Sequence, residues 1–508
     1  MSGGELLHHA FERTVARLPR KQALVCGDQR LTYADIDRHS RQLASALAEN
    51  GVRHGDRVGL LLDNGPEMVA GLFAVLRLGA VCMTINPSIK AEKLGHILGS
   101  TQARALLTHA TLAQAWRDAT VAVPLVVVAG SASPQAGELA WPADDGSIPT
   151  LPPVPGVDGD DLAFISHTSG TTGQPKGVML SHRNLASVTA TIREYLGLAE
   201  DDVIASALPL SFNYGLTQLL AAFAVGATLV LERSFAFPVR MLEIMARERA
   251  TVFPAVPTMY AMLARLQDFS AWDLSPLRIL TSASAPLPAG LATILRQRLP
   301  QARLYVMYGQ TECTRISYLP PEELDAHPGS VGRGMPGQQC WLVDEQGRRL
   351  PAGSTGELVV QGGHVMRGYW NDPAATAHKI RIDPVSAAPA MHTGDLFRSD
   401  DEGWLYFVAR MDDIIKTRGE KVSPLEVEET INGLPGVVES KVVGVRDELL
   451  GQAVKAYVVL AEGAHLDERD VVRHCLARLE NHMVPKTVAF VAALPRTDTG
   501  KIRNPELP

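Results

Sequence analysis

The chain has 508 residues, of which 46% are hydrophobic and 20% are charged, and its formal net charge is −7. Because one hydrophobic core rarely organises so long a chain, we expect several structural units. The acidic balance argues against a general nucleic-acid binder, which needs a basic face.

Cysteine usage and hydropathy indicate a cytoplasmic, soluble protein. The cysteines are odd in number and lack metal-ligand spacing, which disfavours a disulfide framework or a zinc site. The most apolar uncharged run, 219–231, is well short of the ~20 residues that a membrane span needs. The first residues, Met1 to Ala10, contain an acid and no apolar stretch of signal-peptide length. The five cysteines are Cys26, Cys82, Cys313, Cys340 and Cys475.

The first 130 residues alternate between helical and strand patterns. Helices are expected over 6–18, 33–51 and 66–78, and strands over 22–26, 30–33, 57–62, 80–85, 105–108 and 124–128. Strands that alternate with helices predict a mainly parallel sheet covered on both faces. The run 130–161 is rich in proline, glycine and acids, so it is predicted to be an exposed connector.

A segment rich in hydroxyls and glycines follows this connector. The apolar residues Leu162, Phe164 and Ile165 end a predicted strand, which leads into Ser-His-Thr-Ser-Gly-Thr-Thr-Gly-Gln-Pro-Lys-Gly. Glycines let successive backbone N–H groups point to one place, and hydroxyls and a lysine add to that field, so a polyphosphate is the expected ligand. A flexible linker of the same composition is the alternative. The P-loop pattern fails because Pro175 precedes Lys176 and Gly177 follows it. The predicted phosphate-binding residues are Thr168, Ser169, Gly170, Thr171, Thr172, Gly173 and Lys176.

Further motifs follow in order along the chain. After a predicted helix from Arg183 comes the run 203–215, which ends in Phe212, Asn213, Tyr214 and Gly215; later predicted strands lead into a loop of small residues and into Tyr-Gly-Gln-Thr-Glu. Near the C-terminus lie His-Thr-Gly-Asp, Ala-Arg-Met-Asp-Asp-Ile-Ile-Lys and Pro-Arg-Thr-Asp-Thr-Gly-Lys. From Pro424 the pattern predicts a small α+β domain. These last motifs end at Asp395, Lys416 and Lys501.

This ordered set resembles the signatures of the adenylate-forming superfamily, which includes acyl-CoA synthetases, adenylation domains and luciferase. The resemblance runs from about Tyr33 to Lys501, with two departures: His167 stands where tyrosine is common, and Ala409 where glycine is usual. It implies a large N-terminal domain, 1–411, of packed mainly parallel αβ sheets plus a β-subdomain, and a small mobile α+β domain, 412–508.

The resemblance also implies roles for single residues in the nucleotide site. Tyr308 offers a ring face to adenine, Thr311 a hydroxyl to the α-phosphate, and Glu312 a hard oxygen to Mg²⁺. Asp395 and Arg410 contact the ribose, although a solvated turn aspartate is the alternative for Asp395.

In the C-terminal part, the resemblance assigns three further roles. Lys501 is the catalytic lysine, Asp412 the hinge, and Gly419 lets a pantetheine arm pass. The basic residues around Gly419 could meet a phosphate of that arm, and solvated charges are the alternative.

The acyl pocket is expected at two loops. A neutral Asn213, where amino-acid-activating relatives carry an aspartate, makes an α-amino acid less favoured, and its amide could bond a ring hydroxyl. A turn residue before Gly215 is the alternative for Asn213, and a plain βα turn is the alternative for the second loop. The predicted pocket residues are Phe212, Asn213, Tyr214, Gly215, Ser282, Ala283 and Ser284.

The predicted activity is ATP-dependent activation of a carboxylic acid through an acyl-adenylate, with pyrophosphate release, followed by thioester formation. The expected cofactors are ATP, Mg²⁺ and coenzyme A, or the phosphopantetheine of an acyl or peptidyl carrier protein as a second choice of acceptor. A stand-alone amino-acid adenylation enzyme that loads a peptidyl carrier protein is the alternative, and a nucleotide-binding scaffold without turnover is a more distant one. No nucleic-acid partner and no membrane span are expected.

Overall fold

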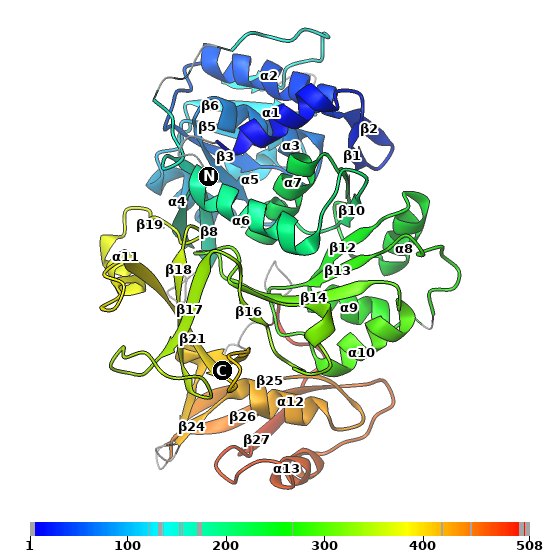
Figure 1. Cartoon of the computed structure of the whole chain (residues 1–508), viewed down its shortest axis with the longest axis vertical. Helices are drawn as coiled ribbons and strands as arrows, with labels where there is room; N and C mark the ends of the chain where they lie inside the picture. Colours follow the sequence, from blue (N-terminus) through cyan, green and yellow to red (C-terminus); the bar gives the residue numbers. More distant parts are fainter. Residues whose placement is uncertain are drawn as a thin grey trace. The chain divides into compact units, whose positions relative to one another are not determined.

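The computed structural model of the chain is shown in Figure 1. It describes residues 6–119, 121–130, 135, 137–151, 154, 156–169, 175–266, 268–417, 420–447, 450–496 and 502. The chain divides into two compact units, Met1–Gln339 with Val360–Met391, and Cys340–Val359 with His392–Pro508. The predicted domain boundary at 411/412 was placed at an expected hinge. That hinge remains a prediction.

An eight-stranded sheet in the first unit carries the predicted phosphate segment. Its order is β19-β9-β8-β4-β3-β5-β6-β7, and the strands from β8 through β7 are parallel to one another, as predicted. Its strands are β3 (Arg57–Leu61), β4 (Val81–Ile85), β5 (Ala105–His109), β6 (Leu125–Ala129), β7 (Glu138–Ala140), β8 (Leu162–Ser169), β9 (Pro175–Ser181) and β19 (Gly368–Tyr369). The predicted connector contributes one element, β7, which lies at the sheet edge, where the missing N–H groups of nearby prolines disturb no central pairing.

A nine-stranded sheet forms the second layer of this unit. Its order is β16-β15-β14-β13-β12-β10-β11-β1-β2, parallel from β14 to β1. Its strands are β1 (Gln22–Cys26), β2 (Gln29–Thr32), β10 (Val203–Ser206), β11 (Thr228–Leu231), β12 (Val252–Ala255), β13 (Ile279–Ser282), β14 (Arg303–Tyr308), β15 (Ser317–Leu319) and β16 (Arg333–Gly334). Since carboxyl ends of parallel strands share one edge of a sheet, the loops after β13 and β14 emerge together.

Helices cover these sheets, and several of them lie in the shared core. They are α1 (Leu7–Arg17), α2 (Tyr33–Glu49), α3 (Pro66–Arg77), α4 (Ala91–Ser100), α5 (Ala113–Arg117), α6 (His182–Leu196), α7 (Asn213–Val225), α8 (Pro238–Arg247), α9 (Pro257–Ala264), α10 (Ala289–Arg298) and α11 (Pro373–Lys379). Helix α7 is buried on most of its surface, because its sequence is apolar on all sides. This helix was not predicted from the sequence.

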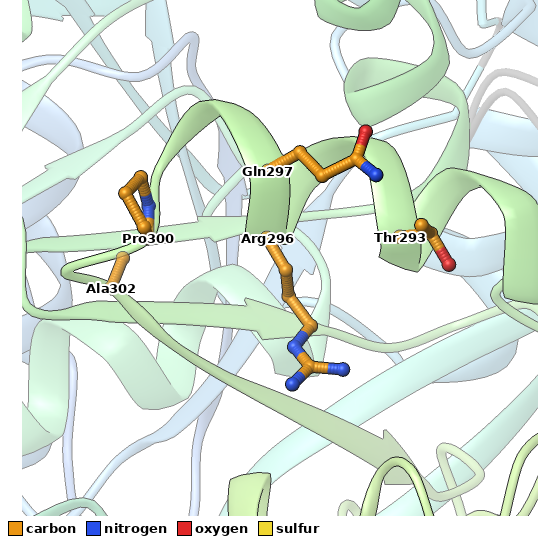
Figure 2. A pocket seen from close by; sticks show the side chains of 5 residues that line it. All are labelled: Thr293, Arg296, Gln297, Pro300 and Ala302. Carbon is orange, nitrogen blue, oxygen red and sulfur yellow. The ribbon is translucent and has the colours of Figure 1, made fainter.

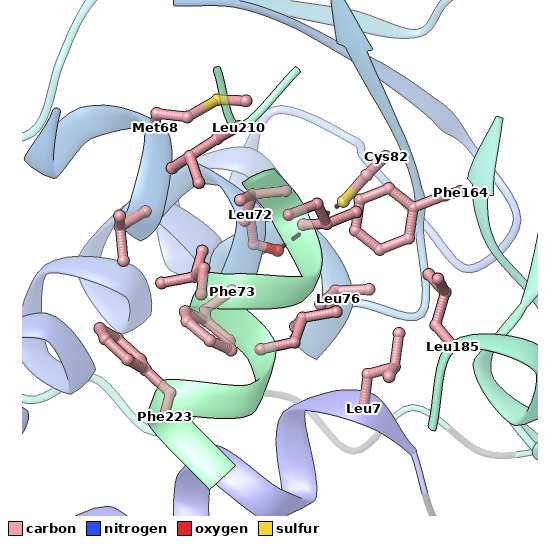
Figure 3. Packing of buried hydrophobic residues seen from close by; sticks show 14 of the residues in the cluster. Leu7, Met68, Leu72, Phe73, Leu76, Cys82, Phe164, Leu185, Leu210 and Phe223 are labelled. Atoms are coloured by element: carbon pink, nitrogen blue, oxygen red, sulfur yellow. Dashed lines mark hydrogen bonds between the residues drawn. The ribbon is translucent and has the colours of Figure 1, made fainter. Parts of the chain in front are cut away.

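The main core joins the two sheets through these helices. Phe73 of α3 stacks on Phe11 of α1 and on Phe223 of α7, with ring centroids 4.1 and 5.7 Å apart. Figure 3 shows Phe73 and Phe223 beside leucines of α1 and α3, with Phe164 of β8 on the far side. The strand that leads into the phosphate segment is therefore anchored in the main hydrophobic core.

The second unit contains strands that run on from the first unit and a small sheet of its own. A five-stranded sheet has the order β17-β18-β21-β20, with β22 paired to β21, and the unit boundary passes through β17, β18 and β21. These strands are β17 (Gln338–Val343), β18 (Thr355–Gly362), β20 (Ile380–Ile382), β21 (Pro389–Ser399) and β22 (Leu405–Arg410). The mixed α/β fold with a further β-subdomain is as predicted.

The C-terminal α+β domain is also as predicted. Its sheet has the order β24-β23-β26-β25, with β27 parallel to β26, and α12 and α13 pack together on it around a core that includes Val442 and Val458. The elements are β23 (Ile415–Thr417), β24 (Glu420–Val422), α12 (Pro424–Asn432), β25 (Val437–Asp447), β26 (Gly451–Leu460), α13 (Glu468–Leu476) and β27 (Thr487–Phe490).

Candidate active site

The predicted phosphate segment forms a β-hairpin. Strands β8 and β9 pair antiparallel, with Thr168 opposite Lys176 and Ser169 opposite Pro175. The backbone of Trp370 donates to the carbonyl of Gly177 at 2.7 Å, which fastens β9 to the segment around β19. The predicted residues Gly170, Thr171, Thr172 and Gly173 lie outside the described residues, as does the side chain of Ser169.

One tyrosine connects the two most specific motifs of the sequence. The ammonium of Lys176 lies over the ring of Tyr369, 5.4 Å from its centroid, and the Tyr369 hydroxyl donates to Glu312 Oε1 at 2.8 Å. In addition, the backbone N–H of Met366 donates to the carbonyl of Glu312 at 2.8 Å. A cation and a carboxylate from distant parts of the chain are thus held on one aromatic side chain.

Asn213 forms a second link between distant segments of this region. It is the first residue of α7 and is buried. Its Oδ1 accepts from Ser166 at 2.9 Å, and its Nδ2 donates to the carbonyl of Thr311 at 3.1 Å and to Thr314 Oγ1 at 3.2 Å. Both ends of the amide are therefore occupied by protein groups, and Asn213 links β8 to the loop that carries Thr311 and Glu312.

That loop, 309–315, is compact and strained. A Cβ at Gly309 would lie 2.5 Å from the carbonyl oxygen of Thr314, so only glycine fits there. Thr314 itself has a φ of 58°, a conformation that costs a β-branched residue on the order of 1–3 kcal/mol. Since Asn213 bonds the Thr314 side chain, it supports the loop at its strained point.

The remaining predicted nucleotide residues of this unit lie at the ends of β14 and its loop. Tyr308 closes β14, and Gln310 Nε2 donates to its hydroxyl at 3.2 Å. Tyr308, Thr311 and Glu312 are all partly exposed, as residues that meet a ligand must be.

The predicted acyl-pocket residues converge around Tyr214. Its hydroxyl donates to the carbonyl of Thr281 at 3.0 Å, directly before Ser282 and Ala283. A Cβ at Gly215 would lie 2.3 Å from the carbonyl oxygen of Pro209, so the turn before α7 needs glycine there. Phe212 precedes α7 at its N-cap position, and Ser284 has a φ of 77°, so the second loop is also strained.

His167, which replaces the common tyrosine, is a partly buried, neutral residue. Its strand position is opposite Gly177. Burial lowers the pKa of His167 to about 4, and the charge on His96 adds to that effect. At neutral pH the residue therefore contributes no positive charge to a phosphate site.

The predicted ribose residues lie in the second unit. Asp395 of β21 is opposite Arg410 of β22 in the antiparallel ladder, and Arg410 Nε lies 3.6 Å from Asp395 Oδ1. The carboxylate of Glu357 accepts from the backbone N–H of Gly394 and from His392 Nδ1, both at 2.9 Å. Gly394 has a φ of 69° within β21, so Glu357 supports the strand directly before Asp395.

The site residues predicted for the C-terminal domain are Asp412, Gly419 and Lys501. Asp412 lies in a short 3₁₀ turn, Met411–Asp413, and is exposed. Ser423 Oγ, just beyond this turn, donates to the carbonyl of Val408 at 2.8 Å. Gly419 and Lys501 lie outside the described residues.

A surface pocket beside α10 has no connection with these residues. It is lined by Thr293, Arg296, Gln297, Pro300 and Ala302, which project from the helix and the following turn (Figure 2). The guanidinium of Arg296 is paired with Asp325. None of its lining residues belongs to the predicted site.

Sequence reasoning did not single out Tyr369 or Arg315 as site residues, and it considered Ser166 only as one of the hydroxyls of the phosphate segment. The signal available for Tyr369 was the sequence Gly-Tyr-Trp-Asn, in which it stands. Arg315 follows the Thr-Glu motif by three residues and is fully buried, which charge patterning alone does not predict.

Comparisons with known proteins agree with this geometry. Residues 11–370 match the AMP-binding enzyme family, and residues 426–501 match the AMP-binding enzyme C-terminal domain. The chain is 35% identical over 496 residues to feruloyl-CoA synthase of an Amycolatopsis species, covering 96% of each. It is 34% identical over 503 residues to indoleacetate–CoA ligase of Aromatoleum aromaticum, covering 98% of this chain and 96% of that protein.

A solved structure extends the likeness to the whole fold. The anthranilate CoA ligase AuaEII, in complex with anthranoyl-AMP, superposes with a TM-score of 0.89 at 29% identity, covering 99% of this chain and 96% of that one. The chain therefore belongs to the AMP-binding enzyme family. It is an AMP-forming acid–CoA ligase, which uses ATP to activate a carboxylic acid and forms a thioester with CoA. Across the described residues, no helix has the length and apolar character that crossing a membrane requires.

Proposed function

We propose that this ligase activates an aromatic carboxylic acid, and that Lys176, Thr311 and Glu312 act on the phosphates of ATP. Aromatic acids are named as the substrates of the similar proteins above, whose names refer to feruloyl, indoleacetate and anthranilate groups. The aromatic ring of Tyr214, beside the small residues Ser282 and Ala283, offers a matching face for a flat acyl group.

The observation that carries the phosphate assignment is the contact of Tyr369 with both Lys176 and Glu312. ATP needs a cation for its phosphates and a hard oxygen for its metal ion. Mg²⁺ keeps most of its waters and takes few protein carboxylates, so a single glutamate suits it. Glu312 would hold it, and when bound it neutralises phosphate charge and polarises the phosphoryl oxygens.

In the first half-reaction, an oxygen of the substrate carboxylate attacks the α-phosphorus of ATP. The bond from that phosphorus to the bridging oxygen breaks, and pyrophosphate leaves. Negative charge grows on the phosphoryl oxygens in transit, and donors fixed in advance stabilise it. Lys176, the Thr311 hydroxyl and Lys501 are the donors that we assign to this charge.

In the second half-reaction, the sulfur of CoA attacks the acyl carbonyl carbon and AMP leaves. The ammonium of Lys501 would obstruct that approach, so we propose that the C-terminal domain turns about Asp412 and presents the Gly419 loop. Tyr308 would stack on adenine, while Asp395 and Arg410 would hold the ribose. A carrier-protein phosphopantetheine presents the same thiol arm as CoA and is the alternative acceptor.

We also propose a cytoplasmic location. All five cysteines are free, which suits a reducing compartment.

A pyrophosphate-release screen tests the proposal. Benzoates, cinnamates, short aliphatic acids and amino acids are supplied with ATP and Mg²⁺, and the aromatic acids are expected to give the highest kcat/KM. CoA and a phosphopantetheinylated carrier protein then compete for the preformed adenylate. Release that depends on amino acids and ignores simple acids would instead establish the amino-acid adenylation alternative.

The two-state role of Lys501 has a separate test. Lys501→Ala is expected to lose adenylate formation while it still converts synthetic acyl-AMP to the thioester at a near-normal rate. Loss of both steps together would contradict the rotation about Asp412.

A further inference from the structure

Arg315 is a buried cation, and none of the described residues compensates its charge. It follows the 309–314 loop and precedes β15, and only 2% of its surface is exposed. Its guanidinium carbon lies 5.0 Å from the centroid of the Tyr214 ring. In the part of the chain that the structure describes, its Nε has no hydrogen-bond partner and its guanidinium forms no ion pair.

Another buried arginine shows how this fold normally satisfies such a group. The side chain of Arg77 is 3% exposed, and its guanidinium bonds the carboxylates of both Glu12 and Asp37. Among the described side chains, the guanidinium of Arg315 contacts an aromatic ring and no carboxylate, and burying a guanidinium without a carboxylate is strongly unfavourable. An anion that arrives with a ligand would remove this penalty.

The neighbours of Arg315 cannot supply that anion themselves. Burial raises the pKa of Tyr214 well above its usual value and that of Tyr195 to about 12, so both phenols stay neutral. The Tyr214 hydroxyl is engaged with Thr281, and the Tyr195 hydroxyl lies 3.1 Å from the sulfur of Met307. No described residue therefore supplies the compensating charge, and an anionic ligand can supply it.

Arg315 also lies where the acyl group is expected. Its partner Tyr214 belongs to the predicted acyl pocket and is bonded to Thr281, next to Ser282. A guanidinium fork binds both oxygens of a carboxylate, which makes that carboxylate a poor nucleophile. The carboxylate that Arg315 suits is thus not the one that attacks ATP.

We propose that Arg315 determines specificity by binding a second carboxylate of the acid, so that the substrate is an aromatic dicarboxylic acid. This inference rests on the proposed activation of an aromatic acid. The ring of the substrate lies against Tyr214, one carboxylate reacts with ATP, and the other pairs with the buried guanidinium.

Matched pairs of acids test the inference. Benzoate is compared with benzene-1,4-dicarboxylate, and cinnamate with 4-carboxycinnamate, by kcat/KM for pyrophosphate release. The dicarboxylate of each pair is expected to have a kcat/KM about 100-fold higher than that of the monocarboxylate. A site discriminates strongly against a ligand that leaves one of its buried polar groups unpaired. Arg315→Met should invert this preference, and Arg315→Lys, which keeps the charge and loses the fork, should weaken it.

Arg303 provides the matched control. It also lies over a tyrosine ring, 5.6 Å from the centroid of Tyr305, but it is exposed and paired with Glu322. Arg303→Met should leave the preference between the two members of each pair as in the unaltered protein.

Thermal melting gives a readout that does not depend on turnover. Benzene-1,4-dicarboxylate without ATP is expected to raise the Tm of the unaltered protein and not that of Arg315→Met. Arg315→Met without ligand should melt no lower than the unaltered protein, since it removes an unpaired buried charge.

Three results would overturn the inference. They are equal kcat/KM for both members of each pair in the unaltered protein, equal losses for both members in Arg315→Met, and no dicarboxylate-dependent change in Tm. If no acid supports pyrophosphate release, the proposed function fails, while the melting experiment still decides the role of Arg315.

Discussion

The two units hold their predicted nucleotide residues by different means. In the first unit, side-chain hydrogen bonds between distant segments do so: Tyr369 reaches Glu312 across 57 residues of sequence, and Asn213 reaches Thr311 across 98. In the second unit, Asp395 and Arg410 are opposite each other on adjacent strands, held by the backbone ladder itself. A single substitution can therefore break the first arrangement more easily than the second.

The largest effect is expected at Glu312 in the first unit. Glu312→Gln removes the charge assigned to Mg²⁺ and should slow adenylate formation about 10²–10³-fold, as loss of a preorganised electrostatic group typically does. Rates of pyrophosphate release over a range of Mg²⁺ concentrations measure this. Glu322→Gln, at an exposed residue paired with Arg303, is the control and should retain the normal rate.

A second substitution removes the Asn213 link. Asn213→Ala leaves Ser166 and Thr314 without their partner, so we expect a loss of about 1–3 kcal/mol in the free energy of unfolding and a fall of about 10–100-fold in adenylation. Urea denaturation and pyrophosphate release measure the two effects.

Asn64→Ala is the matched control for this variant. Asn64 is also buried with three hydrogen bonds, to the backbones of Leu208, Leu210 and Glu232, and it touches neither Thr311 nor Thr314. It should lose a similar amount of stability and much less activity. Equal loss of activity in both variants would mean that Asn213 acts through stability alone.

Tyr369 separates two contributions in the first unit. Tyr369→Phe keeps the ring under Lys176 and removes the hydrogen bond to Glu312, so a fall of about 10-fold in adenylation is expected. Tyr369→Leu removes the ring as well and should cost more, since the contact with the Lys176 ammonium is lost too. Identical rates for the two variants would show that the ring contact contributes nothing.

In the second unit, the loss of a supporting side-chain hydrogen bond should have a smaller effect. Glu357→Gln weakens the hydrogen bond to the backbone of Gly394, but the ladder keeps Asp395 opposite Arg410. We expect a change of less than about 5-fold in the KM for ATP and a stability loss near 1 kcal/mol. A loss as large as that of Asn213→Ala would contradict the contrast between the two units.

Acidic pH should lower the stability of the first unit by protonating buried histidines. Burial lowers the pKa of His182 to about 4, below its ordinary value of 6.5, and its Nδ1 accepts the backbone N–H of Leu7 at 3.2 Å. The unfolded chain then binds a proton that the folded chain does not, so stability is full above pH 6.5 and falls as the pH drops towards 4, by at most about 3 kcal/mol. His182→Asn should reduce this slope in urea denaturation at a series of pH values. An unchanged slope would exclude His182 as a source.

The sequence predicted the elements that carry the motifs, because hydrophobic periodicity and glycine turns are local signals. Strands β8 and β14 and the C-terminal α+β domain lie where the patterns placed them. Helix α7 was missed because it is apolar on all sides and shows no helical stripe.

Partners of the motif residues were not predictable in the same way. Tyr369 forms a hydrogen bond with Glu312, and the amide of Asn213 forms hydrogen bonds with protein groups. Both contacts depend on how distant loops fold together, and the spacing of residues along the chain does not encode this. Arg315 looks like an ordinary surface charge in the sequence, and only packing shows that it is buried.

The strand β19 has only two residues, Gly368 and Tyr369, and it borders β9 at the end of the eight-stranded sheet. An uncovered edge strand invites pairing with another chain and hence aggregation, and very short edge strands are a common protection. The strand that ends the sheet is also the one that carries Tyr369, which contacts Lys176 and Glu312. A change that lengthened this edge strand would therefore disturb those two contacts as well.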